Sequence, residues 1–259
     1  PSYAAASKLT GAVIRNYDLK EENSWIPDLE ALAREDLSKV KIMWVNYPNM
    51  PTGTKASKEF FNELIAFAEA NDIVVCNDNP YAFILNDNPM SLLAGGMSDH
   101  LIELNSLSKS HNMAGWRMGM LASTKAHVDN ILRFKSNLDS GQFLPAQLAA
   151  TEALNLGQEW YDDLNVEYKE RRELAWEIMD LLGATYDKEQ VGMFVWAKVP
   201  DEIEEVEKWI DEILMGAQVF ITPGFIFGSN GERFIRISLC SKQGMFKEAI
   251  ARITKFLKG

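Results

Sequence analysis

The strongest constraint on the fold is a pair of short, largely apolar runs on either side of one amphipathic segment. Residues 41–46 and 72–76 have strand length and few polar side chains, which is typical of strands buried on both faces of a sheet. Between them, Ser57 is a residue type favoured at helix N-caps, and residues 60–68 carry a single apolar stripe. A strand, a helix and a second strand in this order predict a parallel crossover. We therefore expect an α/β fold whose sheet is mostly parallel and flanked by helices.

A second pattern begins after a long amphipathic stretch, residues 158–182, which predicts one continuous helix. Beyond this stretch, runs with strand character alternate with helical segments. Outside the two runs described above, we expect strands at 12–14, 192–199, 219–221 and 231–239 and helices within 24–37, 203–213 and 246–257. The chain is thus expected to contain a large α/β domain over residues 1–157, an interdomain helix over 158–182, and a smaller α+β domain over 183–259.

Charge and composition argue against several classes of partner. The chain has 259 residues and a formal net charge of -11 at pH 7, and no apolar run approaches the ~20 residues that a membrane-spanning helix needs. Nucleic acids and anionic membranes attract basic patches, so we expect neither partner and a cytoplasmic location. Cys76 and Cys240 lie in apolar runs, where buried reduced thiols are expected. His100, His111 and His127 share no metal-ligand spacing, so we expect no metal site.

One stretch, residues 106–119, has the residue types needed to bind a phosphorylated aldehyde. Lys109 follows a short apolar run, Ser106 precedes it, and Arg117 comes eight positions after the lysine. A lysine amine condenses with an aldehyde, while serine and arginine side chains donate hydrogen bonds to a phosphate. Short motifs also recur by chance, so a polar surface loop with a solvated lysine is the alternative interpretation.

This stretch resembles the cofactor-lysine signature of class I and II aminotransferases, the fold-type-I enzymes that use pyridoxal 5′-phosphate (PLP). The family signature S-x-[ST]-K is matched by Ser106 to Lys109, and the following G-x-R-x-G is matched by residues 115–119. The resemblance implies that Lys109 forms the Schiff base with PLP and that Ser106 and Arg117 hold its phosphate. It also implies that residues 1–157 are the PLP-binding large domain.

The first residues extend the resemblance. In the family, a P-x-Y segment such as Pro1-Ser2-Tyr3 lies well inside the large domain. By this likeness the large domain is incomplete at its N-terminus. The absent portion is expected to carry a phosphate-binding turn and the aromatic side chain that stacks on the cofactor ring, so we expect impaired activity in this chain.

Asp78 and Tyr81 follow the second apolar run of the predicted sheet. An aspartate at the end of a strand is most often a cap or a turn residue. This pair, however, resembles the D-x-x-Y of the family, which implies that Asp78 contacts the pyridine nitrogen of PLP and that Tyr81 meets its phenolic oxygen. A carboxylate beside that nitrogen keeps it protonated, so that the ring can accept electrons from the substrate Cα.

A loop rich in proline and glycine, residues 47–53, follows the first apolar run, at a position where ligands often bind in open α/β sheets. It resembles the N-P-x-N-P-T-G of the family, in which the last asparagine donates to the phenolic oxygen of PLP. Here that position is Met50, which cannot donate such a bond, and Asn49 stands one residue earlier. Either Asn49 reaches the cofactor from a shifted backbone or the contact is lost, and we favour Asn49.

Arg236 lies in a predicted strand among apolar neighbours, where an unpaired charge is costly. From the residues alone, a structural ion pair and a ligand site explain this arginine equally well. It resembles the family's arginine that clamps the α-carboxylate of the substrate, and Arg233 is a weaker candidate for that role. Trp196, Phe225 and Phe227 fit core packing or, as an alternative, the walls of a side-chain pocket.

The order of these motifs implies, by resemblance, a PLP-dependent aminotransferase that moves an amino group between an amino acid and a 2-oxo acid. Residues 47–49 and 115–117 resemble the alanine and LL-diaminopimelate aminotransferase branch of the family. The resemblance also places residues 136–150 against a second subunit of a homodimer. Three alternatives stay open: a PLP-dependent lyase on the same scaffold, a PLP-binding effector domain of a regulator, and a binding module with a vestigial site.

Overall fold

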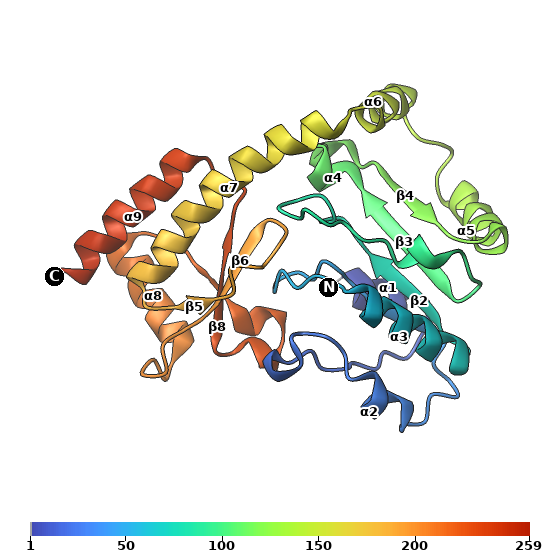
Figure 1. Ribbon diagram of the computed structural model, residues 1–259, viewed down its shortest axis with the longest axis horizontal. Helices are drawn as coiled ribbons and strands as arrows, with labels where there is room; N and C mark the ends of the chain where they lie inside the picture. The colour runs from blue at the N-terminus through green and yellow to red at the C-terminus, as the bar shows by residue number, and fades with distance from the viewer. Residues whose placement is uncertain (1) are drawn as a thin grey trace.

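The computed structural model describes residues 2–259, and within them the strands form two four-stranded sheets. Sheet A contains β1 (Ile42–Val45), β2 (Val74–Asp78), β3 (Leu101–Ser106) and β4 (Gly119–Ala122). Sheet B contains β5 (Thr185–Tyr186), β6 (Phe194–Lys198), β7 (Thr222–Pro223) and β8 (Phe234–Ser238). A long helix, α7 (Gln158–Leu181), runs between the two sheets along the top of the view in Figure 1.

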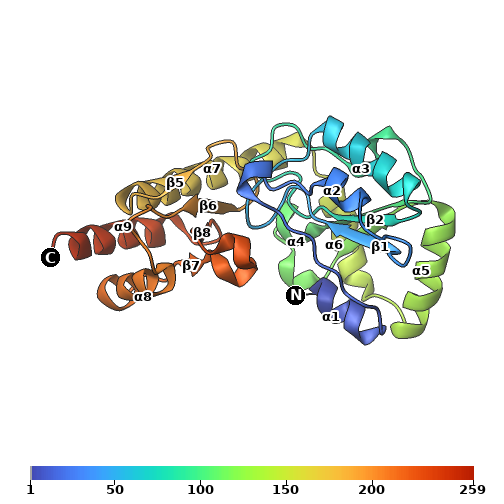
Figure 2. The ribbon, with the colours of Figure 1, turned by 90° about the horizontal axis from the view of Figure 1, so that it is seen from below.

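Sheet A has the strand order β1-β2-β3-β4. Its first three strands are parallel, and β4 pairs with β3 in the antiparallel sense. Figure 2 shows that α3 (Lys58–Ala70) and α1 (Ser2–Leu9) lie on opposite sides of this sheet. The arrangement confirms the predicted α/β fold with a mostly parallel sheet flanked by helices.

Helix α3 begins as the sequence predicts. The Ser57 side chain accepts a hydrogen bond from the Phe60 backbone N–H at 3.0 Å, and this cap satisfies one of the free donors at the helix start. The apolar stripe of α3 packs on sheet A to form the first core, with Met43, Val45, Phe60, Phe61, Leu64, Phe67, Val75 and Leu101 buried. Burying each such side chain stabilises the fold by about 1.5–3 kcal/mol.

The remaining helices complete the part of the chain that the structure describes. The α-helices are α2 (Leu29–Ala33), α4 (Leu107–Ser110), α5 (Lys125–Leu138), α6 (Leu144–Leu154), α8 (Val206–Ala217) and α9 (Gln243–Leu257). Short 3-10 helices are η1 (Glu21–Asn23), η2 (Leu92–Gly95), η3 (Ala114–Trp116), η4 (Gly224–Phe227) and η5 (Ser229–Gly231). Among residues 2–259, no helix is both long enough and apolar enough to span a membrane.

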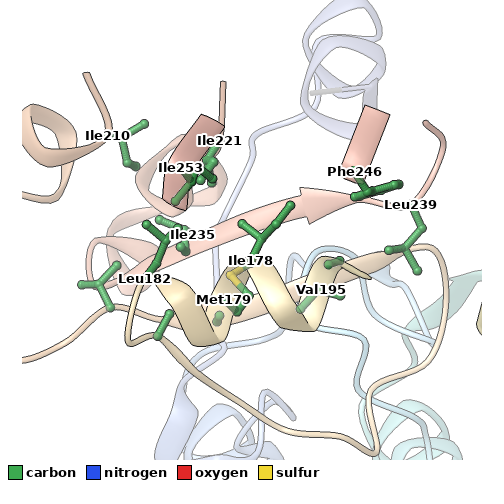
Figure 3. Close-up of a cluster of buried hydrophobic side chains, with 14 of the residues drawn as sticks. Ile178, Met179, Leu182, Val195, Ile210, Ile221, Ile235, Leu239, Phe246 and Ile253 are labelled. Atoms are coloured by element: carbon green, nitrogen blue, oxygen red, sulfur yellow. The ribbon is translucent and has the colours of Figure 1, made fainter. Parts of the chain in front are cut away.

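The second core lies between sheet B and the helices α7, α8 and α9. Figure 3 shows side chains from these elements converging on β8, whose Ile235 is fully buried. Sheet B has the strand order β5-β6-β8-β7 and is antiparallel throughout. The strands expected at residues 192–199 and 231–239 correspond to β6 and β8, each shorter than its predicted range.

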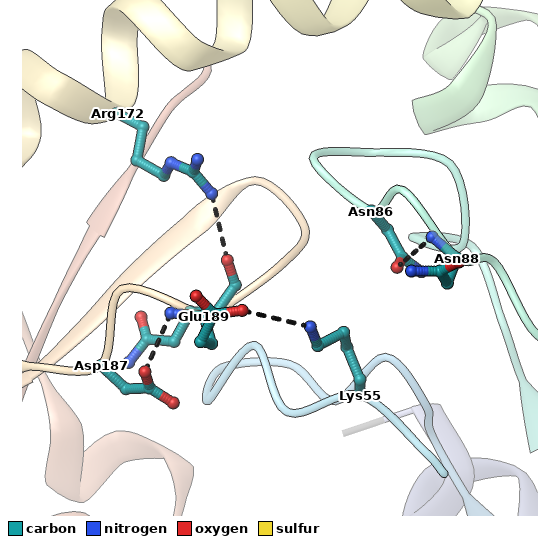
Figure 4. A network of polar contacts seen from close by, with 7 residues as sticks. Lys55, Asn86, Asn88, Arg172, Asp187 and Glu189 are labelled. Carbon is teal, nitrogen blue, oxygen red and sulfur yellow. Dashed lines mark hydrogen bonds and ion pairs between the residues drawn. The ribbon is translucent and has the colours of Figure 1, made fainter. Parts of the chain in front are cut away.

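Polar contacts join sheet B and α7 to the loops of sheet A (Figure 4). Lys55, from the loop before α3, pairs with Glu189 of the loop before β6 at 3.6 Å. That loop is itself held in shape, because Asp187 accepts from the Glu189 backbone N–H at 2.8 Å and Arg172 of α7 donates to the Gln190 carbonyl at 3.2 Å. The same short loop therefore contacts both halves of the chain.

One prediction near the N-terminus is wrong. Residues 12–14 form no strand, because no strand among residues 2–259 supplies backbone partners there, and Val13 is 96% exposed. The loop and helix expected within residues 24–37 are confirmed: Trp25 lies in the loop with a positive φ of 60°, and the helix is short, Leu29–Ala33, with Asp28 as its N-cap.

Two further corrections concern the second half of the chain. Cys240 is exposed rather than buried, because it lies just after the end of β8, whereas Cys76 in β2 is buried as expected. The strand expected at residues 219–221 is shifted to Thr222–Pro223, where the register with β8 allows pairing.

Candidate active site

The carboxyl ends of β2 and β3 bring predicted cofactor residues to one edge of sheet A. Asp78 is the last residue of β2, and Ser106 is the last residue of β3. The two strands are parallel neighbours, with Asp78 opposite Leu104, so both ends lie at the same edge. Asn105 of β3 donates its side-chain amide to the carbonyl of Asn79, the residue after β2, at 2.8 Å. Parallel pairing therefore places the two residues where ligands bind in open α/β sheets.

The Asp78 carboxylate has an aromatic partner that the sequence did not predict. Tyr3 donates its hydroxyl to Asp78 Oδ2 at 2.6 Å, and its ring stacks on Trp44 with centroids 4.7 Å apart. Burial and the neighbouring Asp78 raise the pKa of the Tyr3 hydroxyl, so it stays a donor. Tyr3 and Asp78 are 75 residues apart, and no local pattern indicates such a contact. Pro1, the first residue of the P-x-Y segment, lies outside the described residues.

The loop after β1 uses Asn46 and Asn49 to hold its own shape. Asn46 donates to the Asp78 carbonyl at 2.5 Å and accepts from the Met50 backbone N–H at 2.9 Å. The Asn49 amide donates to the Asn46 carbonyl at 3.2 Å, and its oxygen accepts from Thr52 at 2.9 Å. Both polar ends of Asn49 therefore have partners inside the loop, and its contact with the cofactor remains a prediction without support from this geometry.

Lys109 is half-buried and lies on the short helix α4, directly after β3. The Ser106 hydroxyl caps this helix by accepting from the Ser108 backbone N–H at 3.2 Å. At its other end, α4 is anchored to α7, because Trp160 Nε1 donates to the Ser110 carbonyl at 2.9 Å. Lys109 is thus held between a strand end and the long helix.

His111 strengthens this link between α4 and α7. Its Nδ1 lies 2.8 Å from the Ser110 hydroxyl, and its Nε2 lies 3.2 Å from the Tyr161 hydroxyl. Burial lowers the pKa of His111, so the imidazole is neutral near pH 7 and each ring nitrogen faces a hydroxyl. The segment that carries Lys109 is therefore fixed by side chains as well as by its backbone.

Arg117 lies at the same edge of sheet A, but its side chain is exposed. The register pairs Ser106 with Gly119, two residues after Arg117, which places the arginine beside the end of β3. Its guanidinium donates to the Ala114 carbonyl at 3.1 Å, and no hydrogen bond joins it to Ser106 within residues 2–259. The backbone brings the two predicted phosphate ligands to one edge without a direct contact between them.

Tyr81 is buried close to both Asp78 and Arg236. Burial raises the pKa of its hydroxyl to about 12, with a further increase from the Asp78 carboxylate and a decrease from the Arg236 guanidinium. Its ring packs edge-on against Phe194 of β6, with centroids 5.9 Å apart. Tyr81 therefore connects the sheet A edge to sheet B.

Arg236 of β8 is half-buried and forms no ion pair with any acidic side chain of residues 2–259, so the structural ion pair considered above is absent there. Its guanidinium lies between the rings of Phe194 and Phe227, 4.3 and 4.4 Å from their centroids. One amino group contacts Met50 Sδ at 3.3 Å, and the buried Nε has no partner in the described chain. Burial lowers the pKa of Arg236, yet a guanidinium remains charged, so its unused donors suit a ligand carboxylate.

Arg233 has a structural role instead. Its guanidinium donates to the Pro200 carbonyl at 2.7 Å and to the Ile203 carbonyl, in the loop that follows β6. Both contacts satisfy backbone acceptors, so the side chain is committed to the fold. Of the two arginines near β8, Arg236 is the one that has a buried N–H without a partner among residues 2–259.

The buried tyrosines predict a loss of stability at high pH. Tyr81 has a pKa of about 12 in the fold against an ordinary 10.0, and burial also raises the pKa of Tyr17 and Tyr47. Between pH 10 and 12 the folded chain therefore binds more protons than the unfolded chain, and the free energy of unfolding should fall as pH rises through this window. Urea unfolding at intervals from pH 8 to 11 measures the effect.

Tyr81→Phe provides the control for this prediction. The variant removes one titrating group, so its unfolding free energy should fall less steeply above pH 10, by up to about 1.4 kcal/mol per pH unit. Parallel pH profiles for wild type and variant would contradict the burial of this hydroxyl.

Comparisons with known proteins show which family this chain resembles over nearly its whole length. The model of the family described as aminotransferase class I and II matches residues 1–253. An LL-diaminopimelate aminotransferase of Dehalococcoides mccartyi is 39% identical over all of this chain and 67% of its own length. Another, from Natranaerobius thermophilus, is 37% identical over 99% of this chain and 67% of its own length. The chain thus spans about two thirds of the length of these relatives.

Solved structures show the same fold. The apo structure of BacF from Bacillus subtilis superposes with a TM-score of 0.88 and 35% identity, covering 98% of this chain and 65% of that one. A probable N-succinyldiaminopimelate aminotransferase from Thermus thermophilus superposes with a TM-score of 0.85 and 28% identity, covering 99% of this chain and 69% of that one.

Proposed function

The chain belongs to the class I and II aminotransferase family, a family of PLP-dependent transaminases, and on this premise we propose that the whole protein moves an amino group between an amino acid and a 2-oxo acid. The observation that carries the proposal is Arg236, a half-buried guanidinium with unused donors. A substrate α-carboxylate would satisfy these donors as a bidentate partner.

The residues at the edge of sheet A fit PLP by their chemistry. We assign Asp78 to the pyridine nitrogen, Tyr81 to the phenolic oxygen, Ser106 and Arg117 to the phosphate, and Lys109 to the aldehyde. Tyr3 supports this assignment, because its hydrogen bond orients the Asp78 carboxylate at the strand end. Asn49 has the least support among the proposed cofactor residues, since its side chain is occupied within the loop.

The mechanism requires each side chain to perform one task. Arg236 holds the substrate by its carboxylate and so fixes which bond at Cα faces the reaction centre. When bound, PLP supplies an electron sink that stabilises the negative charge left on Cα. Lys109 would act first as a general base that takes the proton from the substrate Cα. It would then act as a general acid that gives a proton to the former aldehyde carbon of PLP. The Asp78 carboxylate would stabilise a positive charge on the pyridine nitrogen.

An amino-transfer assay tests the proposed function. We expect PLP to produce a visible absorption band in the protein, a substrate amino acid to bleach the band, and a 2-oxo acid to restore it. Chromatography should find one new oxo acid for each amino group transferred. Release of ammonia with loss of the substrate side chain would instead indicate the PLP-dependent lyase, which the relatives do not favour. Absence of any band would contradict cofactor binding by this chain.

We also propose that the protein is a homodimer. Supporting this, α5, α6 and the loop between them expose a group of large apolar side chains, including Leu132, Phe134, Leu138, Phe143, Leu144 and Leu148, each at least 58% exposed. Large apolar side chains exposed in such number on neighbouring elements are typical of subunit contacts. The three-part domain division at residues 157 and 182 and the cytoplasmic location remain predictions.

A further inference from the structure

We propose that Glu103 is a positioning residue for the cofactor: its buried carboxylate fixes the chain on both sides of Asp78 and so aligns the Asp78 carboxylate with the pyridine nitrogen of PLP. The proposal rests on the proposed function, because it assumes that Asp78 binds that nitrogen. It gives a role to a buried acid that takes no part in the proton transfers.

Glu103 is a buried acid without a cationic partner. It lies within β3 and is only 9% exposed. It forms no ion pair with a lysine, arginine or histidine of residues 2–259. A buried carboxylate is costly unless charges or hydrogen-bond donors compensate it. Donors from the surrounding chain must therefore compensate Glu103.

Three donors converge on this carboxylate. Oε2 of Glu103 accepts from the side-chain amide of Asn77 at 3.3 Å and from the backbone N–H of Leu92 at 2.6 Å. Oε1 accepts from the side-chain amide of Asn79 at 3.3 Å. Asn77 lies directly opposite Glu103 in the register of β2 and β3, and Asn79 follows the end of β2. Glu103 thus binds the residues immediately before and after Asp78.

Other partners fix which way the two asparagine amides face. The Asn77 oxygen accepts from the Tyr47 backbone N–H at 3.0 Å, and the Asn79 nitrogen also donates to the Met90 carbonyl at 3.2 Å. Neither amide can turn round without losing its second partner. Residue 103 must therefore accept on both of its side-chain oxygens, which a carboxylate does and a glutamine amide does not.

This network holds Asp78 from the face of sheet A opposite to its own side chain. Side chains alternate along a strand, so Asn77 and Asp78 leave opposite faces of the sheet. On its own face, the Asp78 carboxylate accepts from Tyr3. A hydrogen bond weakens steeply as its geometry departs from linear, so a shift of the chain at Asn77 or Asn79 would weaken the bond from Asp78 to the pyridine nitrogen.

The test compares the affinities of the protein for PLP and for 1-deazapyridoxal 5′-phosphate, in which a carbon atom replaces the pyridine nitrogen. Both compounds carry the aldehyde and the phosphate, so they differ only at the atom assigned to Asp78. Titration followed by protein fluorescence measures both affinities. We expect the wild type to bind PLP more tightly than the analogue. Glu103→Gln should weaken PLP about three- to tenfold and leave the analogue unchanged.

Three further variants complete the experiment. Asp78→Asn should remove the preference for PLP altogether. Asn79→Ala removes the donor on Oε1 of Glu103 and should change the preference in the same direction as Glu103→Gln, and it tests the same contact if Glu103→Gln does not fold. Ser123→Ala is the matched control, because the buried Ser123 hydroxyl donates to the Leu101 carbonyl at 2.6 Å, at the opposite end of β3. This variant should leave both affinities unchanged.

The outcomes separate this proposal from the function on which it rests. If Glu103→Gln and Asn79→Ala weaken PLP and the analogue equally, or weaken neither, Glu103 has only a structural role and the proposal is overturned. If Asp78→Asn alone removes the preference, the assignment of Asp78 stands and the positioning role of Glu103 fails. If Asp78→Asn keeps the preference, or if the wild type binds neither compound, the cofactor assignment fails and the proposal fails with it.

Discussion

Replacing Lys109 with alanine is expected to abolish covalent capture of PLP and to lower the rate of amino transfer by at least about 10³-fold. Lys109 is the lysine that follows β3 on the helix capped by Ser106, close to the strand end that carries Asp78. A positioned general base contributes about 10²–10⁴-fold to a rate. The alanine variant would also lack the amine that bonds covalently to PLP. Borohydride reduction followed by peptide mass spectrometry measures the capture, and a coupled oxo-acid assay measures the rate.

Lys169→Ala is the matched control for Lys109→Ala. Lys169 lies on the exposed face of α7 and makes no ion pair within 4.0 Å of an acidic group in the described residues. This variant should keep both the borohydride label and the full rate. A label that persists in Lys109→Ala, or one that appears on several lysines of the wild type, would mean that capture is non-specific.

Replacing Arg236 with lysine is expected to lower kcat/KM by about 10²-fold, mostly through a higher KM. The fork of a guanidinium binds a carboxylate through two parallel bonds, and lysine offers only a point charge. Losing one partner of a desolvated, hydrogen-bonded charge pair costs about 2–5 kcal/mol. Stability should change little, because Arg236 has no acidic partner in residues 2–259. Steady-state kinetics and thermal unfolding on the same preparations measure both quantities.

Arg233→Met gives the opposite pattern and serves as the control. Its guanidinium bonds the Pro200 and Ile203 carbonyls, so its loss should lower the free energy of unfolding by about 2–3 kcal/mol and leave KM unchanged. If Arg236→Lys were the less stable variant and Arg233→Met had the higher KM, the roles assigned to the two arginines would be reversed.

Local sequence patterns predicted the framework of the molecule because each pattern reports a short-range preference. The Ser57 cap, the apolar stripe of α3 and the apolar run of β2 each act within a few residues, and each appears in the structure. The prediction of a strand at residues 12–14 was wrong because a local pattern does not report distant partners. An apolar run forms a strand only if a partner strand lies beside it.

The sequence motifs predicted the proposed site residues, and the tertiary structure determines where these residues lie relative to one another. Chain order alone puts Asp78 and Ser106 at strand ends and Lys109 just after one, and parallel pairing then brings those ends to one edge of sheet A. The sequence could not show that Tyr3 bonds Asp78, that Asn49 is occupied inside its loop, or that Arg236 has no acidic partner among residues 2–259.

What the sequence by itself determined is the family, the order of strands and helices, and the residue types available for chemistry, because these depend on local spacing. What only the tertiary structure decided is which of those side chains are free to act. Arg233 and Arg236 are three residues apart in the sequence. Arg233 donates to two backbone carbonyls, whereas Arg236 lies against two aromatic rings and has a buried N–H without a partner among residues 2–259. The difference arises because partners for a buried polar group come from distant segments, and only packing brings those segments together.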